Sequence, residues 1–308
     1  MKIAIMAAGG VGGYFGARLA AAGAEVTFIA RGGHLEAIRR DGLRVDSRLG
    51  ALHLRPARAT DRPEEIGPVD IVLFAVKLWD TEAAATACKP LIGADTGVVG
   101  LQNGIDGPEV LAATLGRQHV IGGTAHIAAV IAEPGVIRHT GTMARLTFGE
   151  YHGPNGARVE ALHALCQEAG VDAVLSPDVH RAIWEKFVFL ATFSGLTTLT
   201  RLPKGPILAD ADTRALFRDA LAEVVAVARA KGIGLPADHA DALLRFGDGL
   251  PAEMKSSMLH DLERGNRLEL PWLSGAVARI GRSLGVDTPV HRTIYAALKP
   301  YADGAPAP

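Results

Sequence analysis

Short apolar runs alternate with helical patterns through the first half of the chain. The longest run, Val69–Val76, is almost continuously apolar between Pro68 and Lys77, as is typical of a parallel strand covered on both faces. The pattern predicts strands over Ile3–Met6, Glu25–Ala30, Val69–Val76, Gly97–Leu101 and Val171–Leu175. It predicts helices over Val11–Ala22, Thr81–Leu91 and Val159–Ala169. This alternation indicates an α/β domain with a mostly parallel sheet.

Two further stretches are expected to extend that sheet. Leu43–Val45 and Ala51–Leu54 are spaced as a hairpin, and a short helix should precede them, ending at Asp41. Residues 119–150 contain β-like segments interrupted by Gly and Pro. We expect these segments to complete the sheet.

The pattern changes after Pro177. Asp178 can cap a long apolar helix that runs toward Thr200, and Asp212–Lys231 is amphipathic. Shorter helices are expected near His239–Phe246, Ala252–Glu263, Trp272–Leu284 and Pro289–Tyr301. No strand pattern returns, so we predict an α/β domain over 1–177 and an all-α domain over 178–308, with a frayed tail from Asp303.

A glycine-rich turn follows the first strand. Aligned to the dinucleotide fingerprint G-x-G-x-x-G, it reads Ala7-Ala8-Gly9-Gly10-Val11-Gly12, so an alanine replaces the first glycine. Glycines allow a pyrophosphate to approach the backbone, and the N–H groups and dipole at the helix start favour that anion. The placement predicts a Rossmann-type nucleotide site, although glycine-rich turns also join strands to helices without any ligand.

The residue that follows the second strand bears on the cofactor. Rossmann domains that bind a free adenosine ribose usually carry Asp or Glu about 20 residues past the glycines. Arg31 stands there instead. A guanidinium suits a 2′-phosphate, which favours NADP(H) over NAD(H). A solvated loop arginine is the alternative.

Composition narrows the function classes. The 308 residues carry a formal net charge of −1 and are 48% hydrophobic, which gives no basic field for nucleic acid or an anionic membrane. No apolar run reaches the ~18 residues of a membrane span, and the amino terminus lacks a signal peptide pattern. Cys88 and Cys166 are far apart, and the histidines form no metal-binding spacing. We therefore expect a cytoplasmic protein without a metal.

Two polar residues follow predicted strands on the side where open α/β sheets bind ligands. Lys77 follows the apolar run at 69–76 and could pair with a phosphate. Asn103 follows Gly97–Leu101 and could hydrogen-bond a ribose hydroxyl or a substrate carbonyl. A solvated lysine and an ordinary Asn-Gly turn remain the alternatives.

Two residues of the helical half could take part in acid–base chemistry. Lys186 lies in an apolar helix, where a lysine facing a cleft would be desolvated and its pKa lowered toward the range of a general acid. The same lysine could instead extend to solvent. Glu269 is either an ordinary loop carboxylate or the partner of such a lysine.

Several motifs in one order resemble the ketopantoate reductases (2-dehydropantoate 2-reductases). They are GGVGGYFGARLA with Arg31, AVK at Lys77, LQNG at Asn103, PGVIRHTG, WEKF at Lys186, and KSSMLHDLERGNRLEL. The resemblance covers almost the whole chain. It implies a Rossmann domain that carries NADPH and an α-helical domain that covers a small 2-oxo acid.

The resemblance also implies roles for individual cofactor residues. The turn made by Ala7, Ala8, Gly9, Gly10, Val11 and Gly12 would hold the pyrophosphate. Arg31 would hold the 2′-phosphate, and Lys77 the adenosine end. Asn103 would lie near the nicotinamide ribose and the substrate.

The implied catalytic residues lie in the helical half. Lys186 matches the family's proton donor, which also binds the substrate carbonyl, and Glu269 matches a residue near the nicotinamide ribose and the reacting group. Ser257 matches a contact to the substrate carboxylate. The implied reaction is the NADPH-dependent reduction of ketopantoate to pantoate, a step of pantothenate biosynthesis.

The chain departs from the family where asparagines hold the substrate. Those places are occupied by Leu190, Ser194 and Lys204; of these, Ser194 keeps a hydroxyl for substrate binding. A site without amides need not select a hydroxylated substrate, so a reductase of another 2-oxo acid is the alternative. A non-catalytic NADP(H) sensor and a structural module are further alternatives. The apolar helical half suggests a homodimer.

Overall fold

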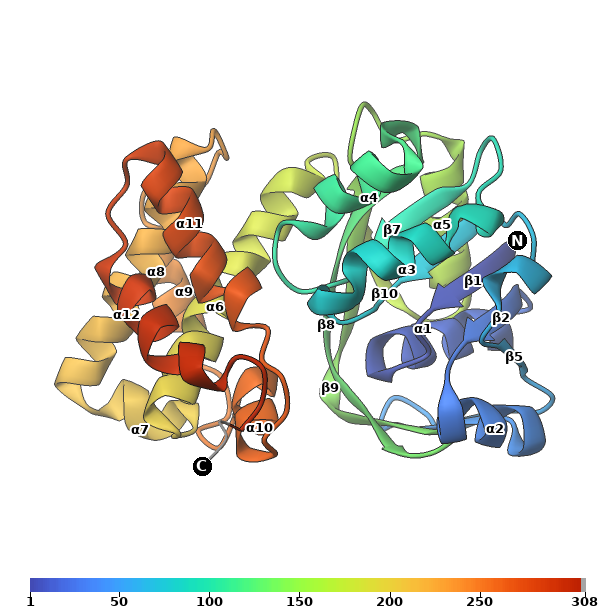
Figure 1. Cartoon of the computed structure of the whole chain (residues 1–308), viewed down its shortest axis with the longest axis horizontal. Coiled ribbons are helices and arrows are strands. Elements are labelled where there is room, and N and C mark those ends of the chain that lie inside the picture. Colours follow the sequence, from blue (N-terminus) through green and yellow to red (C-terminus); the bar gives the residue numbers. More distant parts are fainter. Residues whose placement is uncertain (306–308) are drawn as a thin grey trace. The chain divides into compact units, whose positions relative to one another are not determined.

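The computed structural model describes residues 1–305, and the described chain divides into two compact units after Ala182. The first contains a mixed, mostly parallel sheet with helices, and the described part of the second is helical (Figure 1). The predicted fold class is confirmed. Residues 306–308, and with them the end of the predicted frayed tail, lie outside the described part of the chain.

The sheet of the first unit has ten strands in the order β4-β3-β9-β8-β7-β6-β1-β2-β5, with β10 paired to β9. Within the described chain, all pairs are parallel except β3–β4 and β8–β9. The strands are β1 (Lys2–Met6), β2 (Glu25–Ile29), β3 (Leu43–Asp46), β4 (Leu52–Leu54), β5 (Arg58–Thr60), β6 (Ile71–Phe74), β7 (Gly97–Gly100), β8 (Val120–Glu133), β9 (Val136–Glu150) and β10 (Asp172–Leu175).

Helices cover both faces of this sheet. The α-helices of the first unit are α1 (Gly10–Ala21), α2 (Gly32–Asp41), α3 (Thr81–Ala87), α4 (Gly107–Leu115) and α5 (Ala157–Glu168). Helix α1 packs so closely that a side chain at Gly16 would lie 2.7 Å from Ile5 and 2.8 Å from Phe28. On the other face, a Cβ at Gly100 of β7 would lie 3.5 Å from the Leu111 side chain of α4. Apolar residues at alternating strand positions therefore contact different helices.

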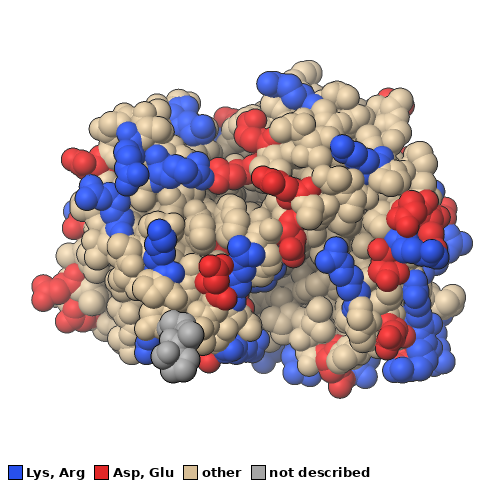
Figure 2. Space-filling model, in the orientation of Figure 1, with Lys and Arg blue, Asp and Glu red and all other residues tan. Residues whose placement is uncertain are grey.

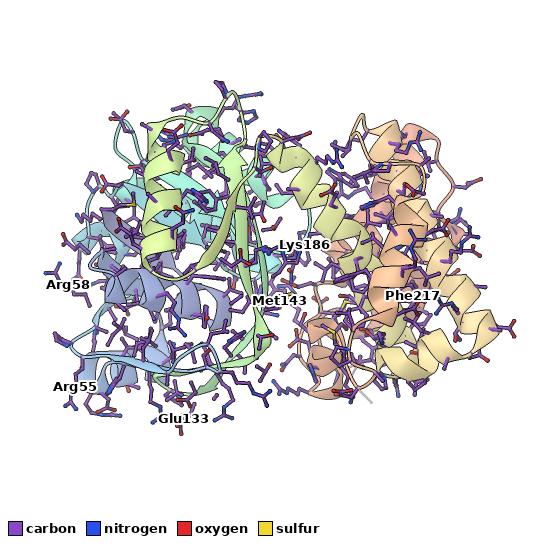
Figure 3. All side chains as sticks on the ribbon, turned by 180° about the vertical axis from the view of Figure 1, so that it is seen from behind. Arg55, Arg58, Glu133, Met143, Lys186 and Phe217 are labelled. Carbon is purple, nitrogen blue, oxygen red and sulfur yellow. The ribbon has the colours of Figure 1, made fainter. Side chains whose placement is uncertain are left out.

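The second unit is built around α6 (Val179–Thr200), which starts in the first unit. Asp178 caps it as predicted, because its carboxylate accepts a hydrogen bond of 3.0 Å from the Arg181 amide. The other helices are α7 (Lys204–Ala209), α8 (Ala211–Ala230), α9 (His239–Asp248), α10 (Ser257–Glu263), α11 (Ser274–Leu284) and α12 (Pro289–Leu298). Phe217 of α8 is fully buried in their core (Figure 3).

Several predicted boundaries were wrong. Helix α10 begins at Ser257 rather than at Ala252, because the Ser256 hydroxyl caps it by accepting from the Leu259 amide at 3.1 Å. The sequence pattern also missed β5 and α4, and it predicted no separate bounds for α7 within the helical half. Short 3-10 turns are η1 (Pro63–Glu65), η2 (Leu78–Asp80), η3 (Lys89–Leu91), η4 (Arg117–His119), η5 (Leu270–Trp272) and η6 (Lys299–Tyr301).

The surface carries charges of both signs. On the face shown in Figure 2, basic and acidic side chains are interspersed, which agrees with the net charge of −1. Among residues 1–305, no helix is both long enough and apolar enough to cross a lipid bilayer.

Candidate active site

The carboxyl ends of three neighbouring strands lie level with one another in the first unit. Met6 of β1 pairs with Phe74 of β6, and Phe74 pairs with Gly100 of β7. Beyond these pairs the Ala75 amide donates to the Met6 carbonyl at 3.0 Å, and the Leu101 amide donates to the Phe74 carbonyl at 2.9 Å. The glycine turn and the segments that carry Lys77 and Asn103 therefore leave the sheet at one edge.

The turn after β1 has an unusual backbone. Ala7 adopts φ +74°, a left-handed conformation that L-residues other than glycine disfavour by about 1–2 kcal/mol. The fingerprint has its first glycine at this position, so the chain keeps the glycine conformation while carrying an alanine. The next residue, Ala8, is buried, and its amide donates to the Ile29 carbonyl of β2 at 2.9 Å.

The glycines of this turn have different reasons to be there. A Cβ at Gly10 would lie 2.1 Å from the Ala129 carbonyl oxygen of β8, and one at Gly12 would lie 2.3 Å from the Ala7 carbonyl oxygen. Both are required by packing within the unit. A Cβ at Gly9 would meet no atom within 4 Å. Gly9 lies at the start of α1, where the first backbone N–H groups have no partner within the helix, so this position leaves room for an anionic ligand.

Arg31 and Lys77 flank the turn from neighbouring strands. Arg31 follows β2, caps α2 with its backbone and exposes its side chain. Lys77 is exposed after β6, with its Nζ 5.4 Å from the centre of the Trp79 ring. Both cations therefore follow the carboxyl ends of strands that neighbour β1, at the edge of the sheet where the sequence analysis predicted them.

Asn103 is half-buried in the loop after β7. The preceding residue, Gln102, fixes this loop, because its amide donates to the Val76 carbonyl at 3.1 Å and to the Thr81 hydroxyl at 2.8 Å. Sequence reasoning did not single out Gln102, although it belongs to the LQNG motif. Its amide ties the segment that holds Asn103 to the one that holds Lys77.

The second unit brings Lys186 and Glu269 together. Lys186 is half-buried on α6 (Figure 3), and Glu269 is only 5% exposed at the start of η5. Burial lowers the pKa of Lys186 to about 8, while the negative charge of Glu269 acts in the opposite direction. This environment leaves a lysine that is still mostly an ammonium at neutral pH but can release its proton readily.

The two remaining predicted substrate residues, Ser257 and Ser194, lie in different environments. Ser257 is exposed at the first position of α10, and neighbouring Ser256 anchors that helix start through a 2.7 Å hydrogen bond between its hydroxyl and that of Thr197 on α6. Ser194 is fully buried, so a substrate could touch it only if the surrounding side chains moved apart. Its substrate contact stays a prediction.

Lys204 and Leu190 occupy the other two positions where the family has asparagines. Lys204 is 4% exposed, and its Nζ donates to the carbonyls of Gly247 (2.9 Å) and Leu250 near the end of α9. Its ammonium thus completes the backbone hydrogen bonds of a helix terminus. Leu190 is half-buried one turn after Lys186, so the lysine has an apolar neighbour along this face of α6.

Comparison with known proteins agrees with this arrangement. Residues 3–153 match the family model "Ketopantoate reductase PanE/ApbA", and residues 178–302 match the model of its C-terminal region. The chain is 34% identical to a 2-dehydropantoate 2-reductase of Mesorhizobium japonicum, over 97% of each chain.

Solved structures give the same answer. A 2-dehydropantoate 2-reductase from Geobacter metallireducens is 35% identical, with a TM-score of 0.91 over 97% of this chain and 99% of that one. A PanE/ApbA family ketopantoate reductase from Ralstonia eutropha is 36% identical, with a TM-score of 0.89 over 98% of both chains. The chain belongs to the ketopantoate reductase family, and it is an oxidoreductase that acts on a CH–OH group.

Proposed function

We propose that this protein reduces ketopantoate to pantoate with NADPH, as a step of pantothenate biosynthesis. Residues 1–177 would bind the cofactor and residues 178–308 the substrate. The observation that carries the proposal is the pairing of half-buried Lys186 with buried Glu269. Reduction of a ketone requires a group that supplies a proton to the developing alkoxide, and Lys186 has the pKa for this role.

The cofactor site of the first unit fits a dinucleotide. The open space at Gly9 and the N–H groups at the start of α1 suit a pyrophosphate held by Ala7–Gly12. Arg31 and Lys77 would engage the adenosine end, and Asn103 the nicotinamide ribose and the substrate. When bound, the dihydronicotinamide supplies a hydride to C2 of the oxo acid.

The protein's own residues handle charge and the proton. The Lys186 ammonium donates a hydrogen bond to the oxo group, stabilises the negative charge that forms on that oxygen, and transfers its proton to give the hydroxyl. Glu269 favours the protonated lysine through its charge, which keeps the acid ready at neutral pH. Ser257 is proposed to hold the substrate carboxylate.

The proton-donor assignment is tested by Lys186→Ala. Turnover should fall by about 10² or more, because general acid catalysis is lost, while NADPH binding measured by fluorescence titration should change little. Near-normal turnover would contradict the assignment. If wild-type protein bound NADPH but reduced no 2-oxo acid, the chain would instead be a sensor.

The choice of NADP(H) over NAD(H) rests on Arg31. Arg31→Gln should raise the KM for NADPH by about tenfold or more, since a charge-assisted contact to the 2′-phosphate is lost. The KM for NADH, which has no such phosphate, should change little. An equal effect on both cofactors would remove the argument for NADPH.

A second candidate is an NADPH-dependent reductase of a 2-oxo acid without a hydroxyl. Two observations favour it: Leu190 puts an apolar side chain one turn from Lys186, and Lys204 uses its ammonium on backbone carbonyls. Comparing kcat/KM for ketopantoate with that for its unhydroxylated branched analogue decides between the candidates. A clear preference for ketopantoate contradicts the second candidate, and equal or reversed preference contradicts the first.

A further inference from the structure

The glycine turn is tied to a distant part of the first unit by the imidazole of His34. This residue lies in the first turn of α2, and its Nε2 is 2.9 Å from the Ala8 carbonyl oxygen. Its Nδ1 accepts a 3.0 Å hydrogen bond from the Gly135 amide, in the turn between β8 and β9. An amide can only donate and a carbonyl can only accept, so Nε2 carries the ring hydrogen. A neutral imidazole therefore bridges the two turns.

The glycine turn needs support because of Ala7. At φ +74° an alanine is strained, whereas a glycine would be at ease. The following residue, Ala8, is held at the peptide on each side of it, since its amide donates to the Ile29 carbonyl at 2.9 Å and its carbonyl accepts from His34. These two hydrogen bonds oppose the backbone rotation through which Ala7 would relax.

The partner turn is itself well anchored. Gly135 is buried, and a Cβ there would lie 3.1 Å from Ala37 of α2. The hairpin also packs against the start of α1, where Gly10 leaves no room for a side chain beside Ala129. Burial lowers the pKa of His34, which keeps the ring in the neutral form that the bridge requires.

We propose that His34 is a positioning residue for the dinucleotide: by bridging Ala8 and Gly135, it holds the alanine-containing turn in the left-handed shape that presents the α1 N–H groups to the pyrophosphate. The inference deepens the proposed function and rests on it. Without the bridge, the competent turn is populated for only part of the time, and the apparent cofactor affinity falls by that fraction.

The test compares two replacements of His34 in the full-length protein. Gln offers one donor and one acceptor at its end, so H34Q can keep the bridge, whereas H34L has similar bulk and neither group. Fluorescence titration with NADPH, and in parallel with NADH, gives the dissociation constants. H34L should weaken binding about three- to tenfold, the effect of one neutral hydrogen bond, and H34Q less than about twofold. The KM for NADPH should change more than kcat.

The decisive arm adds A7G, which removes the strain that His34 offsets. In the A7G background, H34L should bind NADPH within about twofold of A7G alone, although the double variant lacks the bridge that A7G keeps. H53L is the matched control, because His53 also bonds a backbone carbonyl of this unit, that of Asp41 at 2.7 Å. It should bind NADPH like wild type.

Each other outcome is informative. Unchanged binding by H34L, equal losses in H34L and H34Q, or failure of A7G to rescue H34L would overturn the positioning role while leaving the proposed function intact. Wild-type protein that bound neither NADPH nor NADH would overturn the proposed function and the inference with it.

Discussion

The environment of Lys186 predicts where catalysis fails at alkaline pH. Its pKa of about 8 lies well below the ordinary value of 10.5, a net penalty on the ammonium of about 3 kcal/mol. A proton donor is active only when protonated, so the rate of ketone reduction should fall tenfold per pH unit above about 8. This decline forms the alkaline limb of the pH–rate profile. The profile of the Lys186→Ala variant should lack the limb.

Replacing Glu269 by Gln should move that limb to lower pH. The carboxylate charge raises the pKa of Lys186 against the effect of burial, and a neighbouring opposite charge typically contributes about 1–3 units. The limb of Glu269→Gln should therefore lie about 1 unit or more below that of wild type. Its position is independent of any loss in maximal rate, so it reports the charge interaction even if Glu269 also contacts the cofactor.

The assay is the pH dependence of kcat/KM, followed by NADPH absorbance in buffers of constant ionic strength. Glu263→Gln is the control: it removes the same charge from the same unit, but at an exposed position paired with Lys255 at 2.6 Å. Because solvent and salt screen this exposed charge, the alkaline limb of Glu263→Gln should lie at the same pH as that of wild type. An unmoved or higher alkaline limb in Glu269→Gln would refute this account of the Lys186 pKa. A wild-type limb near the ordinary lysine pKa of 10.5 would refute it as well.

Three further predictions concern cofactor, stability and specificity. Gly9→Ala and Gly156→Ala both add a methyl group to an open helix-start position, so both should cost only about 0.5 kcal/mol of stability. Only Gly9→Ala should raise the KM for NADPH, by about tenfold. Equal KM values in the two variants would contradict the pyrophosphate site. Lys186→Met combined with Glu269→Leu should raise the free energy of unfolding in urea at pH 7 by about 1–4 kcal/mol, since it replaces two desolvated, oppositely charged groups by apolar side chains. The part of this stability gain that comes from Lys186 should shrink above about pH 8, because the buried lysine of the folded wild type then loses its proton and its unfavourable charge. A double variant less stable than wild type would contradict the prediction. Lys204→Met should cost about 2–3 kcal/mol by leaving helix carbonyls unsatisfied and should retain kcat/KM; reduced kcat/KM at unchanged stability would instead place Lys204 at the substrate.

Most elements of the fold could be predicted from the sequence, and the misses have local causes. Buried strands such as β6 are continuous apolar runs, and such a run predicts a buried strand however the rest of the chain is arranged. Strand β5 was missed because Arg58–Thr60 is short and mostly polar, at the edge of the sheet. Helix α4 was missed because it begins with Gly107-Pro108, residues that otherwise mark a turn.

The candidate site was predictable to a similar degree. Ala7–Gly12, Arg31, Lys77 and Asn103 could be expected at one edge, because parallel strands end on the same side of a sheet. The hydrogen bond through which Gln102 restrains the Asn103 loop could not be expected, because its acceptor, the Val76 carbonyl, belongs to another segment of the chain. The burial of Ser194 depends equally on neighbours that helical periodicity does not specify.

The sequence by itself determined the fold class, the glycine turn with Arg31 beside it, and the motifs that carry the family resemblance, because these depend on residues close together along the chain. Only the tertiary structure decided how the turn is held and how the lysines behave. His34 meets Gly135 across 101 positions, Lys204 meets the carbonyls at the end of α9, and Lys186 acquires its pKa from burial and from Glu269. Hydrogen bonding and desolvation act through space, so residue order alone could not specify them.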